Sequence, residues 1–400
     1  MSLKSYNRTL FILNFSSFLQ YQRFIMPISF LFYLSNGLTL SDFILFQSIF
    51  NITCLLAKIP MGFLGDIFSK KYLIITSYIM FTLRVLLWIF FSGFWTILTG
   101  EILYGLFKAL FRGNVDSYIY ELLRNNNVEN KMLSKYGKLS LYTSMGSAIS
   151  CIAGAIMYKY LGFKSILIVE LIFQIIAVGL LCFIPNLKSE PVSKRSLKSD
   201  LTIIKESILR ILKNKNINYF AYYSALLTGL TGVFVWNFQP LLKASAAPVI
   251  LFGIVSFVNQ SFRGLGGWFA HKFVSAIGKY LISIEYIFTV TSFLLLIIAN
   301  YYKNYILSTA VIILISFSIC LFVVFNVFTV SKIHENTPSS SRASTSSVNT
   351  FLGDFAAFAF LLMFKFVYDY MGIIPTQILF LILSIILLFP GLKKIFNKLT

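Results

Sequence analysis

The chain alternates between long hydrophobic stretches and short polar ones over its whole length. A membrane-spanning helix needs roughly 20 consecutive, mainly apolar residues, and twelve stretches of this chain have about that length. We place the predicted spans at 10–34, 43–65, 72–92, 94–121, 139–160, 164–184, 216–238, 248–273, 278–299, 303–328, 344–368 and 372–390. The pattern therefore predicts an all-α membrane protein with twelve transmembrane helices.

A polar, basic segment divides these stretches into two sets of six. We predict an N-terminal six-helix half at 1–185, a linker at 186–215 and a C-terminal six-helix half at 216–400, the two halves being related by pseudo-symmetry. Within the linker, 201–212 spaces its apolar residues at helical intervals. This spacing fits an amphipathic helix on the inner leaflet, and a solvated tether between the halves fits the composition as well.

The distribution of lysine and arginine predicts the orientation. With the N-terminus inside, the predicted cytoplasmic segments hold 23 of these residues and the outer loops hold 4. Cytoplasmic loops carry this excess in polytopic membrane proteins. We therefore expect both termini in the cytoplasm. The first stretch is too long for the core of a signal peptide, so we expect it to be retained as a helix.

Composition removes several classes of function. Hydrophobic residues make up 58% of the chain and charged residues 12%, which is too apolar for a soluble fold. The net charge is +20, and most of the basic residues lie between the apolar stretches. The orientation of a membrane protein explains this charge better than nucleic-acid binding does. The four cysteines and two histidines lack metal-site spacing. There is no P-loop and no catalytic constellation, so we expect a transporter rather than an enzyme, with no metal and no cofactor. Short outer loops argue against a receptor.

A motif after the second span carries a family resemblance. Gly62, Gly65 and Asp66 are followed by the basic pair Lys70 and Lys71. A glycine, an aspartate four residues later and then a basic pair resembles the signature loop of the major facilitator superfamily. The glycines would allow close helix packing, and Asp66 would face the positive end of a neighbouring helix.

Three further segments resemble one bacterial branch of that superfamily: 58–62, 113–123 and 342–345. The resemblance implies a monomeric secondary transporter of the cytoplasmic (inner) membrane, in which two halves rock around a central site. It favours proton-coupled efflux of a small organic molecule or metabolite, as in an antiporter. The alternative is an uptake permease for a small anionic nutrient. The resemblance also places Asp66 near Glu121 and the start of the eleventh span, where we expect this cluster to close an inner gate.

Charged residues within spans are costly and indicate functional sites. In the fourth span Lys108, Arg112 and Asp116 are each four residues apart, so they share one helix face. With Arg23 of the first span they would form a cationic site for an anionic or zwitterionic substrate. Asp116 or Glu101 would then act as counter-ion or proton carrier. Alternatively, Asp116 pairs with its two neighbours within the helix, and Arg23 caps a carbonyl.

The second half contributes its own charged residues. Arg263 and Asp354 lie deep in their spans and are expected to face the substrate or proton cavity. Lys365 and Asp369 are four residues apart near a span end, so we expect an interfacial ion pair. No role is predicted for Arg84 and Glu170.

Overall fold

The computed structural model describes residues 3–128, 131–187, 209, 211, 213–278, 280–337 and 342–399. These residues form helices and turns, with no strand among them. The helices of the N-terminal part are α1 (Leu3–Gln20), η1 (Met26–Ile28), α2 (Ser29–Ser35), α3 (Leu40–Ile67), α4 (Lys70–Phe90), α5 (Phe94–Arg124) and α6 (Met132–Cys182). The C-terminal part has α8 (Lys215–Ala244), α9 (Val249–Ile277), α10 (Leu281–Tyr302), α11 (Tyr305–Glu335), α12 (Arg342–Met371) and α13 (Ile373–Leu399).

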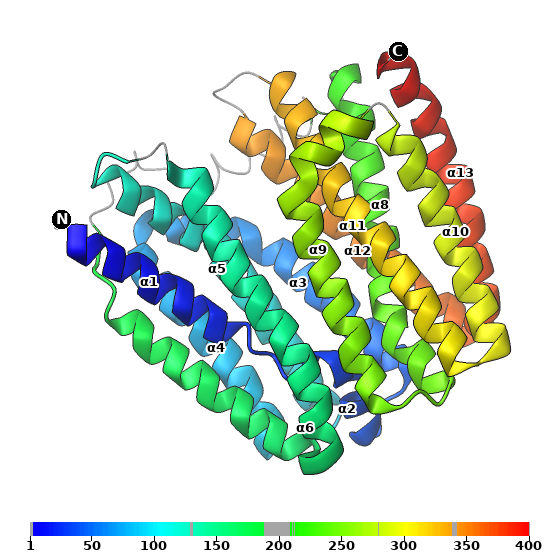
Figure 1. Cartoon of the computed structure of the whole chain (residues 1–400), viewed down its shortest axis with the longest axis horizontal. Helices are drawn as coiled ribbons and strands as arrows, with labels where there is room; N and C mark the ends of the chain where they lie inside the picture. The colour runs from blue at the N-terminus through cyan, green and yellow to red at the C-terminus, as the bar shows by residue number, and fades with distance from the viewer. Residues whose placement is uncertain are drawn as a thin grey trace. The chain divides into compact units, whose positions relative to one another are not determined.

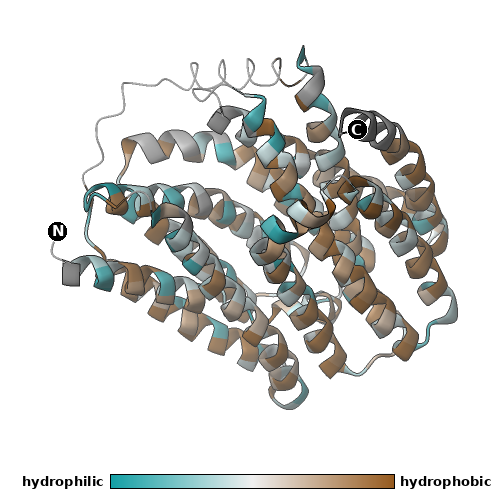
Figure 2. Ribbon diagram, turned by 45° about the horizontal axis from the view of Figure 1, so that its top comes forward, coloured by the Kyte–Doolittle hydropathy of each residue, from teal (hydrophilic) through white to brown (hydrophobic). Residues whose placement is uncertain are grey.

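Eleven of the twelve predicted stretches each fall largely on one helix, and the first is divided between α1, η1 and α2 (Figure 1). Within the described residues, nine helices are long and apolar enough to cross a membrane. Helix α6 is counted once but carries the fifth and sixth stretches, and the apolar part of α13 (Ile373–Phe389) is short. Hydrophobic residues predominate along the helices (Figure 2), as expected where lipid replaces water around a protein. The predicted all-α membrane fold is confirmed.

Helix α6 changes direction at a glycine. Gly162 has φ 72° and ψ 179°, which interrupts the helical backbone between the fifth and sixth stretches. An L-residue with a side chain is strained in this region, whereas glycine is not. The glycine therefore permits a tight reversal with almost no loop.

The first stretch differs from its prediction, because it is interrupted. Helix α1 ends at Gln20 and helix α2 begins at Ser29, with η1 between them (Figure 1). Pro27 lies in the first turn of η1, and proline both lacks an amide proton and disfavours helix in the preceding residue. We call residues 21–28 the α1–α2 break. It leaves backbone groups that side chains from elsewhere must satisfy.

The chain divides into two compact units. Unit 1 comprises Met1–Leu38 and Ile52–Leu197, and unit 2 comprises Thr39–Asn51 and Lys198–Thr400. In unit 1, α1 packs along α6 and α4 packs along α5 and α6. In unit 2, α8 packs along α12 and α10 packs along α11 and α13. In both units the first and third spans each pack along a helix of the last two spans, and the third also packs along the fourth, as expected for an internal repeat. The predicted amphipathic segment 201–212 lies largely outside the described residues.

Candidate functional site

A buried ion pair joins α4 and α5 in unit 1. Arg84 Nη2 lies 2.8 Å from Glu101 Oε1, and the Tyr33 hydroxyl of α2 donates to the same oxygen at 2.6 Å. Arg84, Glu101 and Tyr33 are 6%, 2% and 0% exposed. The guanidinium carbon of Arg84 also lies 3.9 Å from the ring centre of Trp88. Two elements therefore hold Glu101 from either side, and a ring covers the arginine.

The second buried arginine, Arg23, lies in the α1–α2 break. Its Nη1 donates to the Tyr104 hydroxyl of α5 at 2.6 Å. Its guanidinium carbon lies 4.2 Å from the ring centre of Tyr21, 4.8 Å from Phe81, 5.0 Å from Tyr104 and 5.2 Å from Phe107. Arginine over aromatic faces is attractive, and more so when desolvated. The surroundings are thus aromatic rather than acidic.

Arg23 keeps one side of its guanidinium without a partner. Within the described part of the chain, its buried Nε and Nη2 atoms have no hydrogen-bond partner, and no carboxylate lies within ion-pair distance of it. Arg23 is 6% exposed. Burying an unpaired charge costs several kcal/mol, so such a residue inside a membrane protein is a functional candidate.

Two side chains from the part of α6 that follows Gly162 form hydrogen bonds with backbone groups at the α1–α2 break. Glu170 Oε2 accepts the Ile25 amide at 3.1 Å, and Gln174 Nε2 donates to the Gln20 carbonyl at 3.2 Å. Glu170 and Gln174 are fully buried. Glu170 Oε1, Gln174 Oε1 and the amide group of Gln20 have no partner among the described residues. The break is therefore lined by polar atoms with unused hydrogen-bonding capacity.

Two glycines in the part of α6 that precedes Gly162 allow the backbone of α1 and of the α1–α2 break to approach this helix closely. Gly154 faces the Phe24 carbonyl so closely that any Cβ there would clash with backbone, and Gly146 faces the Phe18 carbonyl in the same way. Small residues allow such close approach of helices in membranes. Glycines on one part of α6 and polar side chains on the other thus hold the break in place.

Shared rings join the two arginines into one site. Arg84 lies 5.2 Å from the Phe81 ring centre and 4.7 Å from that of Tyr104, and both rings also contact Arg23. We define the unit 1 cluster as Arg23, Tyr33, Arg84, Glu101, Tyr104 and Glu170. It brings together two cations, two carboxyl groups and two phenols from α2, α4, α5, α6 and the break, and all of these residues are buried except Tyr104, which is half-buried.

Sequence reasoning found part of this cluster. Arg23 and Glu101 were predicted site residues, but Arg84 and Glu170 had no assigned role and the two tyrosines were not identified. One signal was available, since Arg84 and Glu101 lie at similar distances from the short turn between α4 and α5. Two helices joined by such a turn run antiparallel, which brings those positions together. Nothing in the sequence indicates that Glu170 faces a helix break.

The other residues predicted for the fourth span lie elsewhere on α5. The helix is continuous, so Lys108, Arg112 and Asp116 share one side as expected. Lys108 is exposed and Asp116 is half-buried, while the side chain of Arg112 lies outside the described residues. Arg23 donates to Tyr104 rather than capping a carbonyl.

Residues predicted in the second half have mixed outcomes. Arg263 is exposed and Asp354 is half-buried. The predicted ion pair is confirmed, since Lys365 Nζ lies 2.7 Å from Asp369 Oδ2. Unit 2 also buries Glu285 of α10 to 1% exposure, with Oε2 unpartnered among the described residues.

The signature motif ends α3 and begins α4. Gly62, Gly65 and Asp66 are helical in α3, so only Phe68 and Ser69 form the turn. The side chains of the first three lie outside the described residues. Lys70 is 8% exposed. Glu121 is half-buried in the last turns of α5.

The turn after α3 contacts the chain at the end of α6. Lys71 Nζ donates to the Cys182 carbonyl at 2.8 Å, and the Ser69 hydroxyl donates to the Asn186 side chain. The Tyr118 hydroxyl donates to the Pro185 carbonyl at 2.8 Å. A lysine near the last carbonyls of a helix is favourable. The signature turn therefore fixes the point at which the chain leaves the sixth span.

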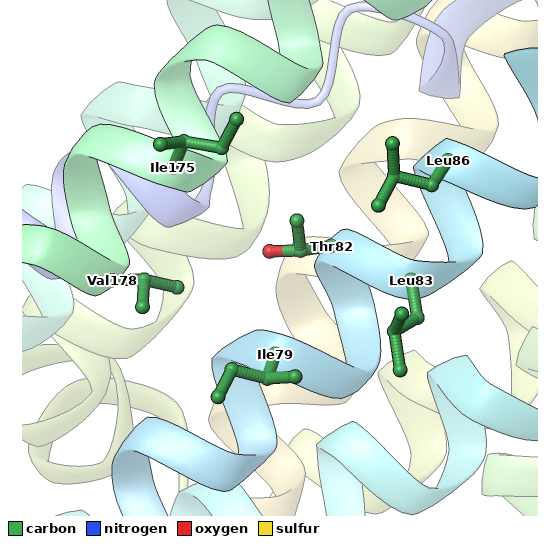
Figure 3. A pocket seen from close by; sticks show the side chains of 6 residues that line it. All are labelled: Ile79, Thr82, Leu83, Leu86, Ile175 and Val178. Carbon is green, nitrogen blue, oxygen red and sulfur yellow. The ribbon is translucent and has the colours of Figure 1, made fainter.

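An apolar cleft lies between α4 and α6 (Figure 3). Its lining residues are Ile79, Thr82, Leu83, Leu86, Ile175 and Val178. The Thr82 hydroxyl, the polar group among them, donates to the Tyr78 carbonyl at 2.9 Å. A wall without available polar groups cannot orient a polar solute, so this cleft is unsuited to recognise one. Among the described residues, no group of three or more His, Cys, Asp or Glu could hold a metal ion.

Comparison with known proteins decides the family. The model of the Major Facilitator Superfamily matches residues 10–361. This chain belongs to the Major Facilitator Superfamily. It is thus a multi-pass membrane protein of this family, as the motif predicted. An uncharacterised transporter of Buchnera aphidicola subsp. Acyrthosiphon pisum, BU466, is 23% identical over 204 residues. That match covers 50% of this chain and 47% of the relative, so the chain spans about half the length of the curated relative it matches.

Solved structures of superfamily-type transporters have the same fold. A single-residue variant of the nucleoside transporter NupG has a TM-score of 0.79 at 15% identity, over 96% of this chain and 98% of that one. A transporter of the POT family in complex with 5-aminolevulinic acid has 0.76 at 13%, over 99% and 97%. A bacterial homologue of the human lysosomal transporter Spinster has 0.72 at 11%, over 100% and 98%. At these identities the likeness concerns the fold alone.

Proposed function

We propose that this member of the superfamily is a secondary active transporter that moves a small organic molecule by alternating access, driven by the proton gradient. The observation that carries this proposal is the unit 1 cluster, because a buried arginine without a carboxylate partner inside a membrane requires a function. The rocking of two repeated halves around a site is the general mechanism of such folds. The protein is a monomer in this proposal and uses no cofactor.

Proton coupling rests on carboxyl groups within spans. Glu101 and Glu170 belong to the cluster, and Glu285 is buried in unit 2. Asp116 and Asp354 are half-buried. The sequence predicts Asp116 as a counter-ion or proton carrier and places Asp354 in the substrate or proton cavity. A carboxyl group that moves between dry and wet surroundings changes its affinity for a proton, which allows it to load on one side and release on the other.

The proposal also includes the direction of transport and the orientation of the protein in the membrane. Resemblance to the efflux branch favours export, and the excess of lysine and arginine in alternate loops favours cytoplasmic termini in a bacterial inner membrane. The inner gate would be formed by the signature motif, with Asp66 and Glu121.

A second candidate is uptake of a small anionic nutrient. The buried Nε and Nη2 atoms of Arg23, which have no partner among the described residues, favour it, because a guanidinium with two unused donors suits a carboxylate or phosphate. A solved transporter with the same fold is in complex with 5-aminolevulinic acid, which bears a carboxylate. This ligand is consistent with the second candidate.

Untargeted mass spectrometry of cells and medium tests the proposal. A strain that lacks the gene is compared with one that overproduces the protein, and an Arg84→Ala strain serves as the inactive control. A compound retained inside the deficient strain and enriched outside the overproducer establishes export. A compound left in the medium by the deficient strain establishes uptake. Identical metabolite profiles would overturn transport of an organic molecule, and transport that persists after collapse of the proton gradient would overturn the coupling.

A further inference from the structure

We propose that the apolar cleft between α4 and α6 holds an acyl chain of an anionic phospholipid, whose phosphate group lies at Lys71. The cleft and this lysine together form a lipid-binding site on the surface of unit 1. This inference goes beyond the proposed function and does not depend on it, because the site is the same for any transported molecule and for either direction of transport.

The cleft is open on one side. Three of the side chains that line it are exposed, by 42% at Ile79, 45% at Leu83 and 56% at Ile175. The other three are half-buried and form its floor. Both helices are apolar enough to cross a membrane, and exposed apolar surface on such helices contacts lipid. The molecules that meet this cleft are therefore membrane lipids.

The size and chemistry of the cleft select a narrow apolar occupant. Its volume is about 220 Å³, which is below the roughly 300–1,000 Å³ of sites for drug-sized ligands. Figure 3 shows the Thr82 side chain between those that α6 contributes and those of Leu83 and Leu86. The Thr82 hydroxyl donates to the Tyr78 carbonyl, so it is not available to an occupant. An acyl chain is narrow and needs no hydrogen bond, so it meets both conditions.

The position of the cleft along the helices matches the depth of an acyl chain. Helix α4 begins at Lys70 and α6 ends at Cys182, and Lys71 Nζ donates to the Cys182 carbonyl at 2.8 Å. These two ends therefore lie at the same membrane surface. With a rise of 1.5 Å per residue, Val178 lies about 6 Å from the end of α6 and Leu86 about 22 Å from Lys71. One leaflet has about 15 Å of hydrocarbon, so the cleft extends along the whole length of a lipid chain.

The side chains at this end of the cleft are typical of a membrane interface. Phe68, Tyr72 and Phe183 are exposed there, and aromatic residues are enriched at the level of the lipid headgroups. Lys71 lies among them in the sequence and is half-buried. Its ammonium has three donors, and the Cys182 carbonyl receives one of them. A lipid phosphate at this level is thus within reach of a cation.

The charge around this end favours an anionic lipid over a zwitterionic one. The segment that follows α6, residues 186–215, contains eight Lys and Arg but three Asp and Glu. A basic segment next to a membrane span attracts anionic lipids, and each basic side chain near the surface strengthens this attraction by about 5-fold. Lys71 contacts the end of the helix from which this segment starts. Its charge and that of the segment therefore act on the same headgroup.

Native mass spectrometry of the purified full-length protein tests the site, because it counts the lipid molecules that remain bound. The probes are dioleoyl phosphatidylglycerol, dioleoyl phosphatidylcholine and dihexanoyl phosphatidylglycerol, each titrated into the same detergent. We expect one dioleoyl phosphatidylglycerol to bind at least about 5-fold more tightly than the zwitterionic lipid, because Lys71 contacts the phosphate of a headgroup that keeps its negative charge. The short-chain lipid should bind more weakly than either, because it does not reach the cleft.

Two kinds of variant separate the headgroup from the chain. Lys71→Gln should weaken binding of dioleoyl phosphatidylglycerol by about 5-fold and leave phosphatidylcholine almost unchanged. Thr82→Phe and Val178→Phe fill the cleft, so each should weaken binding of both dioleoyl lipids. The matched controls are Lys164→Gln, an exposed lysine near the opposite end of the sixth span, and Ile287→Phe, an exposed position on α10. Both controls should bind lipid as the wild type does.

Several results would overturn the inference. They are equal binding of the anionic and the zwitterionic lipid, equal binding of the short and the long chains, or unchanged binding in Lys71→Gln. Unchanged binding in both Thr82→Phe and Val178→Phe would remove the cleft from the site. Displacement of the lipid by millimolar inorganic phosphate would mean that the site recognises the anion alone. A dimer that either phenylalanine variant abolishes would show that a second copy of the chain occupies the cleft. The comparison of the three lipids on the wild type decides the inference even where a variant fails to fold.

Discussion

The two units bury acidic residues in different ways. In unit 1, Glu101 is paired with Arg84 and bonded by Tyr33, and Glu170 caps a backbone amide at a helix break. In unit 2, Glu285 is equally buried, yet it forms no ion pair with any described residue. The span of unit 2 that corresponds to the broken one is the continuous helix α8. The charged network thus accompanies the break, which indicates that a repeated scaffold can be specialised in one half only.

The difference has a physical origin in the backbone. A broken helix inside a membrane exposes amides and carbonyls that lipid cannot satisfy. Polar side chains such as Glu170 and Gln174 are then required nearby. A continuous helix such as α8 satisfies its own backbone, so its neighbours can remain apolar.

Removal of one partner of the buried ion pair should have the largest effect. Arg84→Ala leaves Glu101 buried without its cation, and loss of one partner of a buried pair costs about 3–5 kcal/mol. Thermal unfolding in detergent, followed by circular dichroism, measures the change. The double variant Arg84→Met with Glu101→Met should recover most of the stability, because no unpaired charge remains. A single variant as stable as the wild type would remove the distinction between the units.

The second-largest effect on stability is expected from a substitution in the close packing at the break. Gly154→Ala forces a Cβ into the Phe24 carbonyl, and overpacking of this kind costs about 1–3 kcal/mol. Gly179→Ala on the same helix is the control, because nothing lies within 4 Å of its added Cβ. Replacing a helical glycine with alanine at an open position stabilises by about 0.4–1 kcal/mol. The two variants should therefore shift the melting temperature in opposite directions, and a shift of the same sign would contradict the packing.

A smaller change is expected for the buried acid of unit 2. Glu285→Gln keeps the shape of the side chain and breaks no ion pair among the described residues, so the free energy of unfolding should change by less than about 1 kcal/mol. Glu101→Gln, which leaves Arg84 without its partner, should cost clearly more. Equal costs for the two substitutions, measured by the same unfolding transitions, would mean that Glu285 also serves a charged partner.

The exposed pair of unit 2 should matter least. Lys365 and Asp369 are four residues apart on α12, and their side chains are 19% and 38% exposed. Exposed pairs with this spacing contribute about 0.3–0.5 kcal/mol. Lys365→Met should therefore leave the melting temperature almost unchanged in high salt, and a large loss would show that this pair acts in the way that Arg84 and Glu101 do.

Most of the fold could be predicted from the sequence. Length and hydropathy give the number of spans, since a helix must match the bilayer whatever its neighbours are. The break was missed because the first stretch is mainly apolar over 24–34 and a lone Pro27 is compatible with a kinked helix. The candidate site was found in part, because charge within a span is visible in the sequence while the residue that faces it is not.

By itself, the sequence determined that this protein has an all-α, multi-pass membrane fold and belongs to the Major Facilitator Superfamily, because hydropathy, a signature motif and the position of charges are local properties of the chain. Only the tertiary structure decided which charges meet. Arg84 with Glu101, Arg23 with Tyr104, and Glu170 with the Ile25 amide come from segments between 17 and 145 residues apart. Such pairs depend on the rotation and depth of packed helices, which a pattern read along one helix does not contain.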